Sequence, residues 1–155
     1  MMRFLIQRVK KASVTVENDT VGKIETGFLV LIGIRDHDST VIADRMIHKM
    51  MGLRIFEDHN GKTNLNLESV NGSVLLISQF TLYANCRHGN RPSFLDAGDP
   101  SHAEDLYRYI ATQCKSLGLS VQDGIFGANM QVELVNDGPF TILLDSSDLG
   151  YDNLS

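Results

Sequence analysis

The chain has 155 residues, of which 43% are apolar and 21% charged, and its formal net charge is −5. This composition is typical of a soluble globular domain and excludes an intrinsically disordered chain. The acidic balance argues against a broad basic face that wraps duplex nucleic acid. No apolar run approaches the roughly 20 residues of a transmembrane helix, and residues 1–5 lack the order of a signal peptide, so we expect a cytoplasmic protein without membrane contact.

The first half of the chain predicts strands around one helix. We expect strands at 4–9, 12–18, 21–25 and 28–32, the last being continuously apolar like a buried central strand. Asp38-Ser39-Thr40 indicates a helix start, and the helix should end at Gly52. Its expected buried face consists of Ala43, Met46, Ile47, Met50 and Met51. Asn60-Gly61 predicts a hairpin between strands at 53–56 and 63–67.

The second half begins with the strongest predicted strand, at 73–83, followed by a long polar loop at 85–100. Ser101 and Glu104 match a capping box, so we expect a second helix to begin there. The expected buried stripe of this helix consists of Leu106, Ile110, Cys114 and Leu117, and Gly118 should end it. Three final strands are predicted at 121–126, 130–135 and 140–144.

This order of elements predicts an α+β fold. We expect a strongly curved or barrel-like, largely antiparallel β-sheet with two main helices. One domain should span residues 1–148, followed by a polar C-terminal tail at 149–155. The glycine-rich phosphate loops of Rossmann and P-loop proteins are missing from the sequence.

Ionisable side chains offer few starting points for catalysis. Cys86 and His88 lie two residues apart in the polar loop, and neighbours at that spacing rarely hold the geometry of a nucleophile and its base. The five histidines are too scattered for a zinc site, and two cysteines are too few for a disulfide framework. We therefore expect no metal or other cofactor.

Two segments carry more information. Gly138-Pro139, set between apolar runs, combines a residue without Cβ and a residue without N–H, so carbonyl groups can point outward from this corner. Ser78-Gln79-Phe80-Thr81 lies at the end of the predicted strand 73–83. Serine and threonine are ordinary strand residues, but amide, hydroxyl and free N–H groups at a strand end can also stabilise a developing oxyanion.

Together these segments resemble the motif pair of the D-aminoacyl-tRNA deacylases. The similarity runs over nearly the whole chain, and it includes Gln7-Arg8-Val9, Arg54-Ile55-Phe56, Arg91-Pro92-Ser93-Phe94 and Met130-Gln131-Val132. Members of this family cleave the ester between a D-amino acid and the 3′ adenosine of tRNA, and they also remove glycine mischarged on tRNA. They are homodimers, in which the Gly-Pro corner of one subunit enters the active site of the other.

The resemblance implies roles for particular residues. The peptide between Gly138 and Pro139 is expected to be cis, and its carbonyls to hold the substrate ammonium while blocking an L side chain. The backbone N–H of Phe80, with Gln79, Thr81 and Ser78 in support, is expected to face the ester carbonyl. Further residues are expected near the aminoacyl or adenosine pocket, although helix surface and core are their ordinary interpretations: Ala103, Phe126 and Met130. Arg8 and Arg91 are expected to assist the tRNA acceptor end or the dimer.

Three alternatives remain open at this point. The first is a hydrolase of the same fold that removes an L-amino acid from mischarged tRNA, although the Ser-Gln-Phe-Thr segment favours the D-specific reading. The second is a catalytically idle module that binds RNA. The third is a hydrolase that uses Cys86 as its nucleophile.

Overall fold

The computed structural model describes residues 1–154. One sheet runs through the molecule in the order β2-β1-β3-β6-β7, and β8 pairs with β1 outside this path. Its strands are β1 (Arg3–Val16), β2 (Asp19–Ile24), β3 (Gly27–Gly33), β6 (Ser73–Ser78), β7 (Ser120–Asp123) and β8 (Gln131–Asp145). Pairs β1–β2, β1–β3 and β1–β8 are antiparallel, whereas β3–β6 and β6–β7 are parallel. The predicted curved, mostly antiparallel sheet is therefore confirmed, with a parallel part that the sequence did not indicate.

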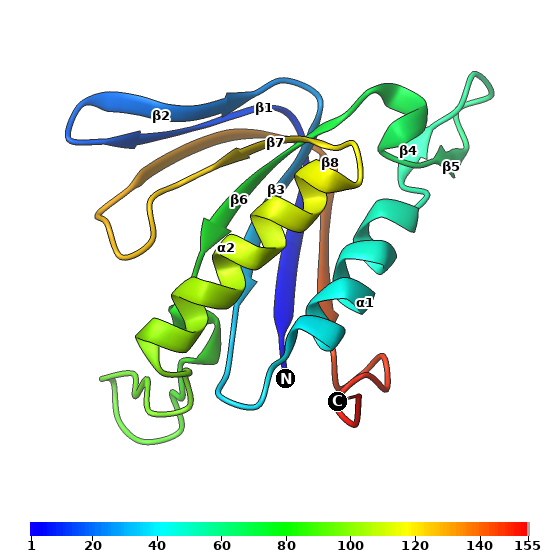
Figure 1. The fold of residues 1–155 in the computed structure, drawn as a ribbon. Helices are drawn as coiled ribbons and strands as arrows, with labels where there is room; N and C mark the ends of the chain where they lie inside the picture. Colours follow the sequence, from blue (N-terminus) through cyan, green and yellow to red (C-terminus); the bar gives the residue numbers. More distant parts are fainter. Residues whose placement is uncertain (155) are drawn as a thin grey trace.

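Two helices, α1 (Thr40–Gly52) and α2 (Pro100–Ser116), lie side by side over one face of the sheet (Figure 1). A small hairpin of β4 (Phe56–Glu57) and β5 (Thr63–Leu65) follows α1, and a 3₁₀ turn occupies Glu68–Val70. Both predicted helices and the Asn60-Gly61 hairpin are confirmed. No helix among the described residues is long and apolar enough to span a bilayer.

Both faces of β3 and β6 are buried, which explains their continuous apolar sequences. Phe28 and Val30 of β3 point into the main core beneath the helices, whereas Leu29 packs into a second cluster on the other face. Because successive strand residues point to opposite faces, one strand supplies both clusters. The second cluster also contains Leu75 and Ile77 of β6, so the curled sheet has an apolar inner face of its own.

The helix boundaries show one confirmed helix start and one correction. Ser39 caps α1, and its hydroxyl accepts the N–H of Ile42. The predicted capping box at Ser101 is wrong, because Asp99 caps α2 and its carboxylate accepts the N–H groups of Ser101 and His102. Pro100 then takes the first helical position, where its missing N–H has no cost.

The expected buried stripe of α2 also needs a correction at its end. Leu106, Ile110 and Cys114 are buried, but Leu117 lies beyond the helix and is exposed. At the C-terminus, Leu149, Tyr151 and Leu154 pack against the main core, so the polar tail makes more apolar contacts than its composition indicates.

The predicted strand 73–83 is too long. β6 ends at Ser78, Gln79 forms a link, and Phe80–Tyr83 forms a 3₁₀ turn. The prediction of two strands at 130–135 and 140–144 is also wrong, because both belong to β8. Asn136 pairs with Val9 and Thr141 pairs with Gln7, so Arg8 alone lies opposite the four residues 137–140. The Gly138-Pro139 segment is therefore a wide bulge within one strand, here called the Gly-Pro bulge (residues 137–140).

Candidate active site

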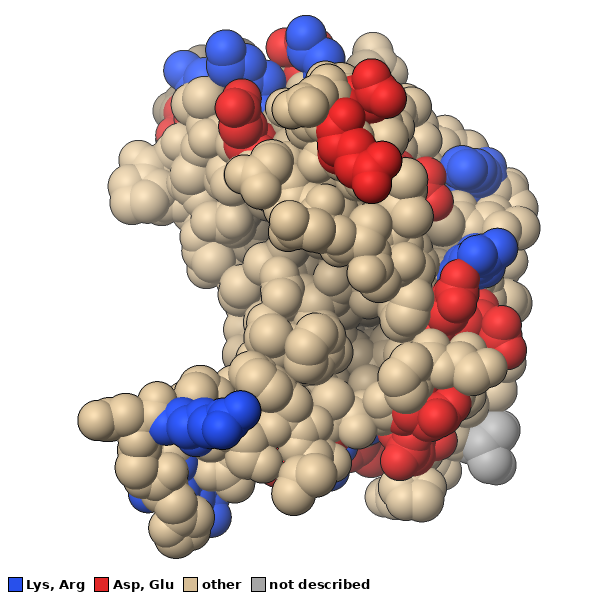
Figure 2. All heavy atoms as spheres, turned by 90° about the vertical axis from the view of Figure 1, so that its left-hand side faces the viewer, with Lys and Arg blue, Asp and Glu red and all other residues tan. Residues whose placement is uncertain are grey.

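A cavity of about 630 Å³ opens at the carboxyl ends of the parallel strands β3 and β6. Such strand ends are a common place for ligand sites in sheets with parallel strands. The wall also includes the loop before α2, the first turn of that helix and the β7–β8 connection. Figure 2 shows this face of the molecule hollowed, with uncharged atoms around the hollow and charged residues above and below it.

The cavity brings together six of the nine residues proposed from the sequence. These lining residues are Ser78, Gln79, Phe80, Ala103, Phe126 and Met130. They come from three separate stretches of the chain, so only the fold unites them. Thr81 does not line the cavity; it follows Phe80 in the 3₁₀ turn, and its hydroxyl accepts a hydrogen bond from the side-chain amide of Gln79.

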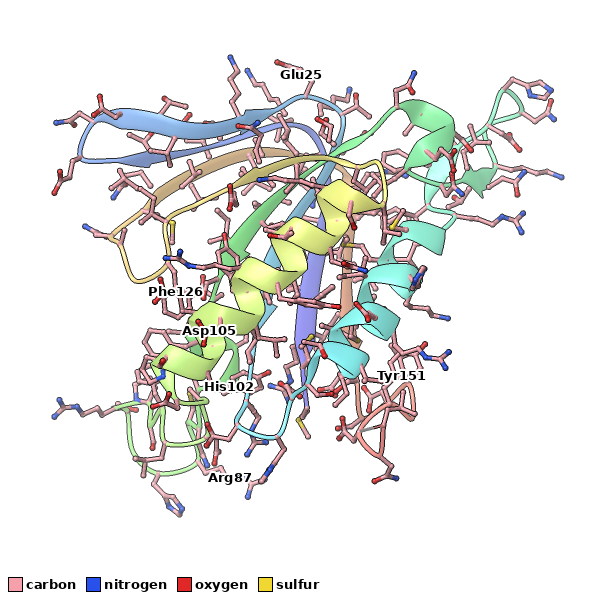
Figure 3. All side chains as sticks on the ribbon, viewed as in Figure 1. Glu25, Arg87, His102, Asp105, Phe126 and Tyr151 are labelled. Carbon is pink, nitrogen blue, oxygen red and sulfur yellow. The ribbon has the colours of Figure 1, made fainter. Side chains whose placement is uncertain are left out.

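Aromatic contacts position two of these side chains. Phe80 is 56% exposed and packs edge-to-face against Phe94, with ring centroids 5.2 Å apart. Phe126, labelled in Figure 3, lies 6.1 Å from the ring of Tyr107. Tyr107 is buried and donates to the carbonyl of Leu76 at 2.7 Å, and its desolvation raises its pKa above the ordinary value. This tyrosine is therefore a neutral, fixed support for Phe126.

The 3₁₀ turn leaves donors available beside the cavity. Within residues 1–154, neither the N–H of Phe80 nor that of Thr81 has a hydrogen-bond acceptor, as is usual for the first residues of a helical turn. The neighbouring N–H of Gln79, in contrast, donates to the carbonyl of Ile32 at 2.8 Å. The end of β6 is thus held to β3, while the next two N–H groups can serve a ligand.

The lining contains no ionisable side chain among the described residues; its polar side-chain groups are the Ser78 hydroxyl and the Gln79 amide. Cys86, the nucleophile of one alternative, lies in the wall of a different, polar cavity. The arrangement therefore favours chemistry that works by exclusion of water, hydrogen bonding and positioning rather than by a charged side chain.

The Gly-Pro bulge does not line the cavity of its own chain. Gly138 and Pro139 are exposed, and the peptide between them is cis, as expected. Gly138 leaves no room for a side chain, because a Cβ there would lie 2.5 Å from the backbone nitrogen of Phe140. At Gly138 this exposed part of β8 thus presents main-chain atoms.

Two side chains hold the bulge, and neither was predicted to do so from the sequence. Asn136 spans it, accepting the N–H of Phe140 at 2.7 Å and donating to the carbonyl of Phe140 at 3.1 Å. Arg8 is buried, donates to the carbonyl of Asp137 at 2.8 Å and lies 4.6 Å from the ring centre of Phe140. The sequence does show that Arg8 is a charged residue in a largely apolar strand. Its contact with the bulge, however, follows only from the register of β1 against β8.

The chain is similar to known proteins over nearly its whole length. A model of the family described as D-Tyr-tRNA(Tyr) deacylase matches residues 5–145. A protein named D-aminoacyl-tRNA deacylase from Thermosipho africanus is 52% identical over 145 residues, which cover 94% of this chain and 97% of the relative. A protein of the same name from Lactobacillus gasseri is 51% identical over 144 residues, with coverage of 93% and 99%.

Solved structures share the fold. The c-Myc DNA unwinding element binding protein superposes with a TM-score of 0.86 at 38% identity and covers 94% of this chain and 98% of its own. A probable eukaryotic D-amino acid tRNA deacylase superposes with a TM-score of 0.74 at 17% identity, with coverage of 92% and 98%. At that identity the second likeness shows the fold alone.

Proposed function

Because this chain belongs to the D-Tyr-tRNA(Tyr) deacylase family, we propose that it hydrolyses the ester bond of D-aminoacyl-tRNA. The products are free tRNA and the D-amino acid, and mischarged glycyl-tRNA is a further substrate. This reaction keeps D-residues out of protein synthesis in the cytoplasm, where aminoacyl-tRNA is used.

The observation that supports this proposal best is a cavity in which no described lining residue is ionisable, next to the free N–H group of Phe80, which itself lines the cavity. An aminoacyl ester is already activated, so its hydrolysis needs positioning and oxyanion stabilisation more than a strong nucleophile. Positioning can supply about 7–11 kcal/mol and one oxyanion donor about 3–4 kcal/mol. In the proposed reaction the Phe80 N–H donates to the ester carbonyl oxygen, Ser78 and Gln79 support it, and water attacks with help from the substrate's ribose hydroxyl.

A substrate ammonium group in this cavity requires acceptors, and no carboxylate lines the described walls. We assign this task to the carbonyls of Gly138 and Pro139 from a second copy of the chain, which makes the active enzyme a homodimer. The exposed bulge supports the assignment, since it presents main-chain atoms and lies outside its own cavity. Its backbone occupies the space of an L side chain, so rejection works by steric exclusion.

This exclusion has a clear consequence for substrate range. A filter that rejects L-residues without touching a particular D side chain accepts many D-residues. It also accepts glycine, which has no side chain to collide. Ala103, Phe126 and Met130 surround the aminoacyl group or the terminal adenosine in the proposed complex, because all three line the same cavity.

Matched D-tyrosyl-tRNA, L-tyrosyl-tRNA and glycyl-tRNA test the proposal directly. We expect release of labelled D-tyrosine and glycine, with L-tyrosyl-tRNA left intact. Release of L-tyrosine alone would instead support the L-specific hydrolase, and tight binding of all three without ester loss would support an idle RNA-binding module. A covalent acyl adduct on Cys86, sought by mass spectrometry of a quenched reaction, would revive the thiol nucleophile.

A further inference from the structure

A second cavity, of about 440 Å³, carries a local excess of positive charge on this acidic protein. Its walls include Arg3, Arg35 and Arg87, opposed by Asp96. Figure 3 shows Arg87 at the same end of the molecule as His102 in the first turn of α2. This is the end at which β3 and β6 finish, and therefore the end at which the first cavity opens.

Two of the three arginines keep free donors. Arg3 is already engaged, since its Nε pairs with Asp145 at 2.9 Å and its Nη1 donates to the carbonyl of Leu82 at 2.7 Å. The guanidinium of Arg35 has only the weak acceptor Met1 Sδ at 4.0 Å, and the side chain of Arg87 has no hydrogen bond or ion pair within residues 1–154. Guanidinium groups bind phosphate oxygens through two parallel N–H donors, so these two residues suit an oxyanion.

Tyr83 forms a fixed platform between these groups. Its hydroxyl donates to the carbonyl of Met1 at 2.5 Å, and its ring packs so closely on Gly33 that a Cβ there would lie 2.9 Å away. The guanidinium carbons of Arg3 and Arg35 lie 5.1 and 5.7 Å from the ring centre. Cation–π contact orients a guanidinium group while the N–H groups at its edge stay free. The guanidinium groups are therefore held in place before a ligand binds.

The two cavities share a wall. Ile34 lines the first and Arg35 the second, and consecutive Cα atoms are only about 3.8 Å apart. The 3₁₀ turn contributes Phe80 to the first cavity and Tyr83 to the second. The wall is tightly packed, since the N–H of Gly98 donates to the carbonyl of Ile34 at 3.2 Å and a Cβ on Gly98 would lie 2.9 Å from that oxygen.

We propose that the second cavity binds a backbone phosphate of the tRNA 3′ strand, just before the aminoacylated adenosine held in the first cavity. This inference rests on the proposed function, because that function places the terminal nucleoside in the first cavity. An RNA strand that leaves the first cavity across the shared wall brings its phosphodiester groups to Arg35 and Arg87. A small site of this kind permits tRNA binding by a protein of net charge −5.

Substrates with and without phosphates test this assignment. We expect Arg35→Ala and Arg87→Ala each to raise the KM for D-tyrosyl-tRNA about tenfold with little change in kcat, as for a lost charged hydrogen bond. Cleavage of D-tyrosyl-adenosine, which lacks phosphates, should not change. Arg45→Ala, an exposed arginine on α1, is the matched control. Equal losses on both substrates, or losses no larger than those of the control, would overturn the proposal.

The salt dependence gives a second kinetic readout. Each lost phosphate contact should make the plot of log affinity against log salt concentration less steep by about 0.7. Arg35→Lys should keep the wild-type slope, because lysine retains the positive charge. It should still bind tRNA more weakly, because lysine lacks the two parallel N–H donors of arginine. An unchanged slope in Arg35→Ala and Arg87→Ala would contradict a phosphate contact.

Binding can also be measured without catalysis, because Cys86 is exposed and lines the same cavity. tRNA that carries no amino acid should slow the alkylation of Cys86, and tRNA trimmed of its 3′ CCA should protect Cys86 less. Protection should weaken in the Arg35→Ala/Arg87→Ala double variant. If D-tyrosyl-tRNA is not cleaved but protection persists, only the proposed function fails. If cleavage is normal and tRNA does not protect, the phosphate site is wrong. If inorganic phosphate at equal concentration protects as well as tRNA does, the cavity binds a free anion and the assignment to the tRNA 3′ strand is wrong.

Discussion

Arg8 of β1 donates from Nε to the backbone carbonyl of Asp137 at 2.8 Å, directly before the exposed Gly138. The same guanidinium donates from Nη1 to the carbonyl of Ile55 at 2.5 Å. One buried side chain therefore joins the Gly-Pro bulge to the segment that follows α1. Because both acceptors are main-chain oxygens, the position of the bulge depends on the backbone and on Arg8.

Arg8→Ala should weaken both the fold and the proposed selection of substrates. Removal of two charged hydrogen bonds in a buried site should lower the free energy of unfolding by about 2–4 kcal/mol. Urea denaturation measures this change, and the rate ratio for D- and L-tyrosyl-tRNA measures selection. Arg8→Lys should restore part of the stability, but less of the selectivity, because an ammonium cannot match the planar fork. Wild-type selectivity in a folded Arg8→Ala protein would contradict the positioning role.

Gly138→Ala should reduce deacylation strongly. The new Cβ would meet the nitrogen of Phe140 at 2.5 Å, so the bulge must shift, and a displaced main chain no longer fits the proposed partner cavity. We expect a loss of at least about 100-fold in kcat/KM, the scale of a misplaced catalytic contact. Gly52→Ala is the matched control, because its Cβ would have no neighbour within 4 Å. Full activity and unchanged selectivity in a folded Gly138→Ala protein would refute the role of the bulge.

Mixing two inactive variants tests whether the bulge acts across subunits. Gly138→Ala and a cavity-filling Ala103→Phe protein should each be inactive alone. After unfolding and refolding in equal amounts, half of the dimers contain both chains, and each of these has one site with an intact cavity and an intact partner bulge. Activity should therefore return to about a quarter of the wild-type value. No recovery in mixtures that form heterodimers would show that bulge and cavity of one chain act together.

Cys114 should make the protein less stable at alkaline pH. Burial raises the pKa of its thiol from 9.0 to about 12, so folding favours the protonated form. The contribution of this thiol to the free energy of unfolding is complete below pH 9. It is lost as the pH rises toward 12, at up to about 1.4 kcal/mol per pH unit.

Between pH 9 and 10 this thiol contributes more of the slope than either buried tyrosine, because the tyrosines have an unfolded pKa of 10.0 and ionise mainly above that pH. Cys114→Ala should flatten the stability curve there in urea titrations. Ile110→Val, a nearby core substitution on α2 without a titrating group, should keep the original slope. An equal slope in the wild type and in Cys114→Ala would contradict the assignment.

Local patterns predicted the elements whose stabilising contacts are local. The turn signals and the cap at Ser39 are read within a few residues, and the apolar run of β3 reflects burial on both faces. The end of β6 after Ser78 was missed because its sequence stays strand-like while the hydrogen-bonded partner β3 ends close by. β8 was divided in two because its continuity across the bulge depends on β1, more than 120 residues earlier in the sequence.

In the candidate site, too, local motifs were predictable and contacts between distant residues were not. The segment Ser78–Phe80 was found through its motif, whereas Arg35 and Tyr83 carry no motif and come together only in the folded chain, where both line the second cavity. The roles of Arg8 and Asn136 depend on which main-chain atoms the bulge turns toward them. A one-dimensional pattern does not contain that information.

The residues that anchor the bulge differ in how well they should tolerate substitution. Ile55 and Asp137 contribute carbonyl oxygens to Arg8, and every amino acid supplies that same atom. Exchanges such as Ile55→Val or Asp137→Asn thus keep the anchor, although the second weakens a 3.7 Å ion pair. Only the arginine is irreplaceable in this trio, so an engineer could redesign both of its neighbours while leaving the geometry of the corner intact.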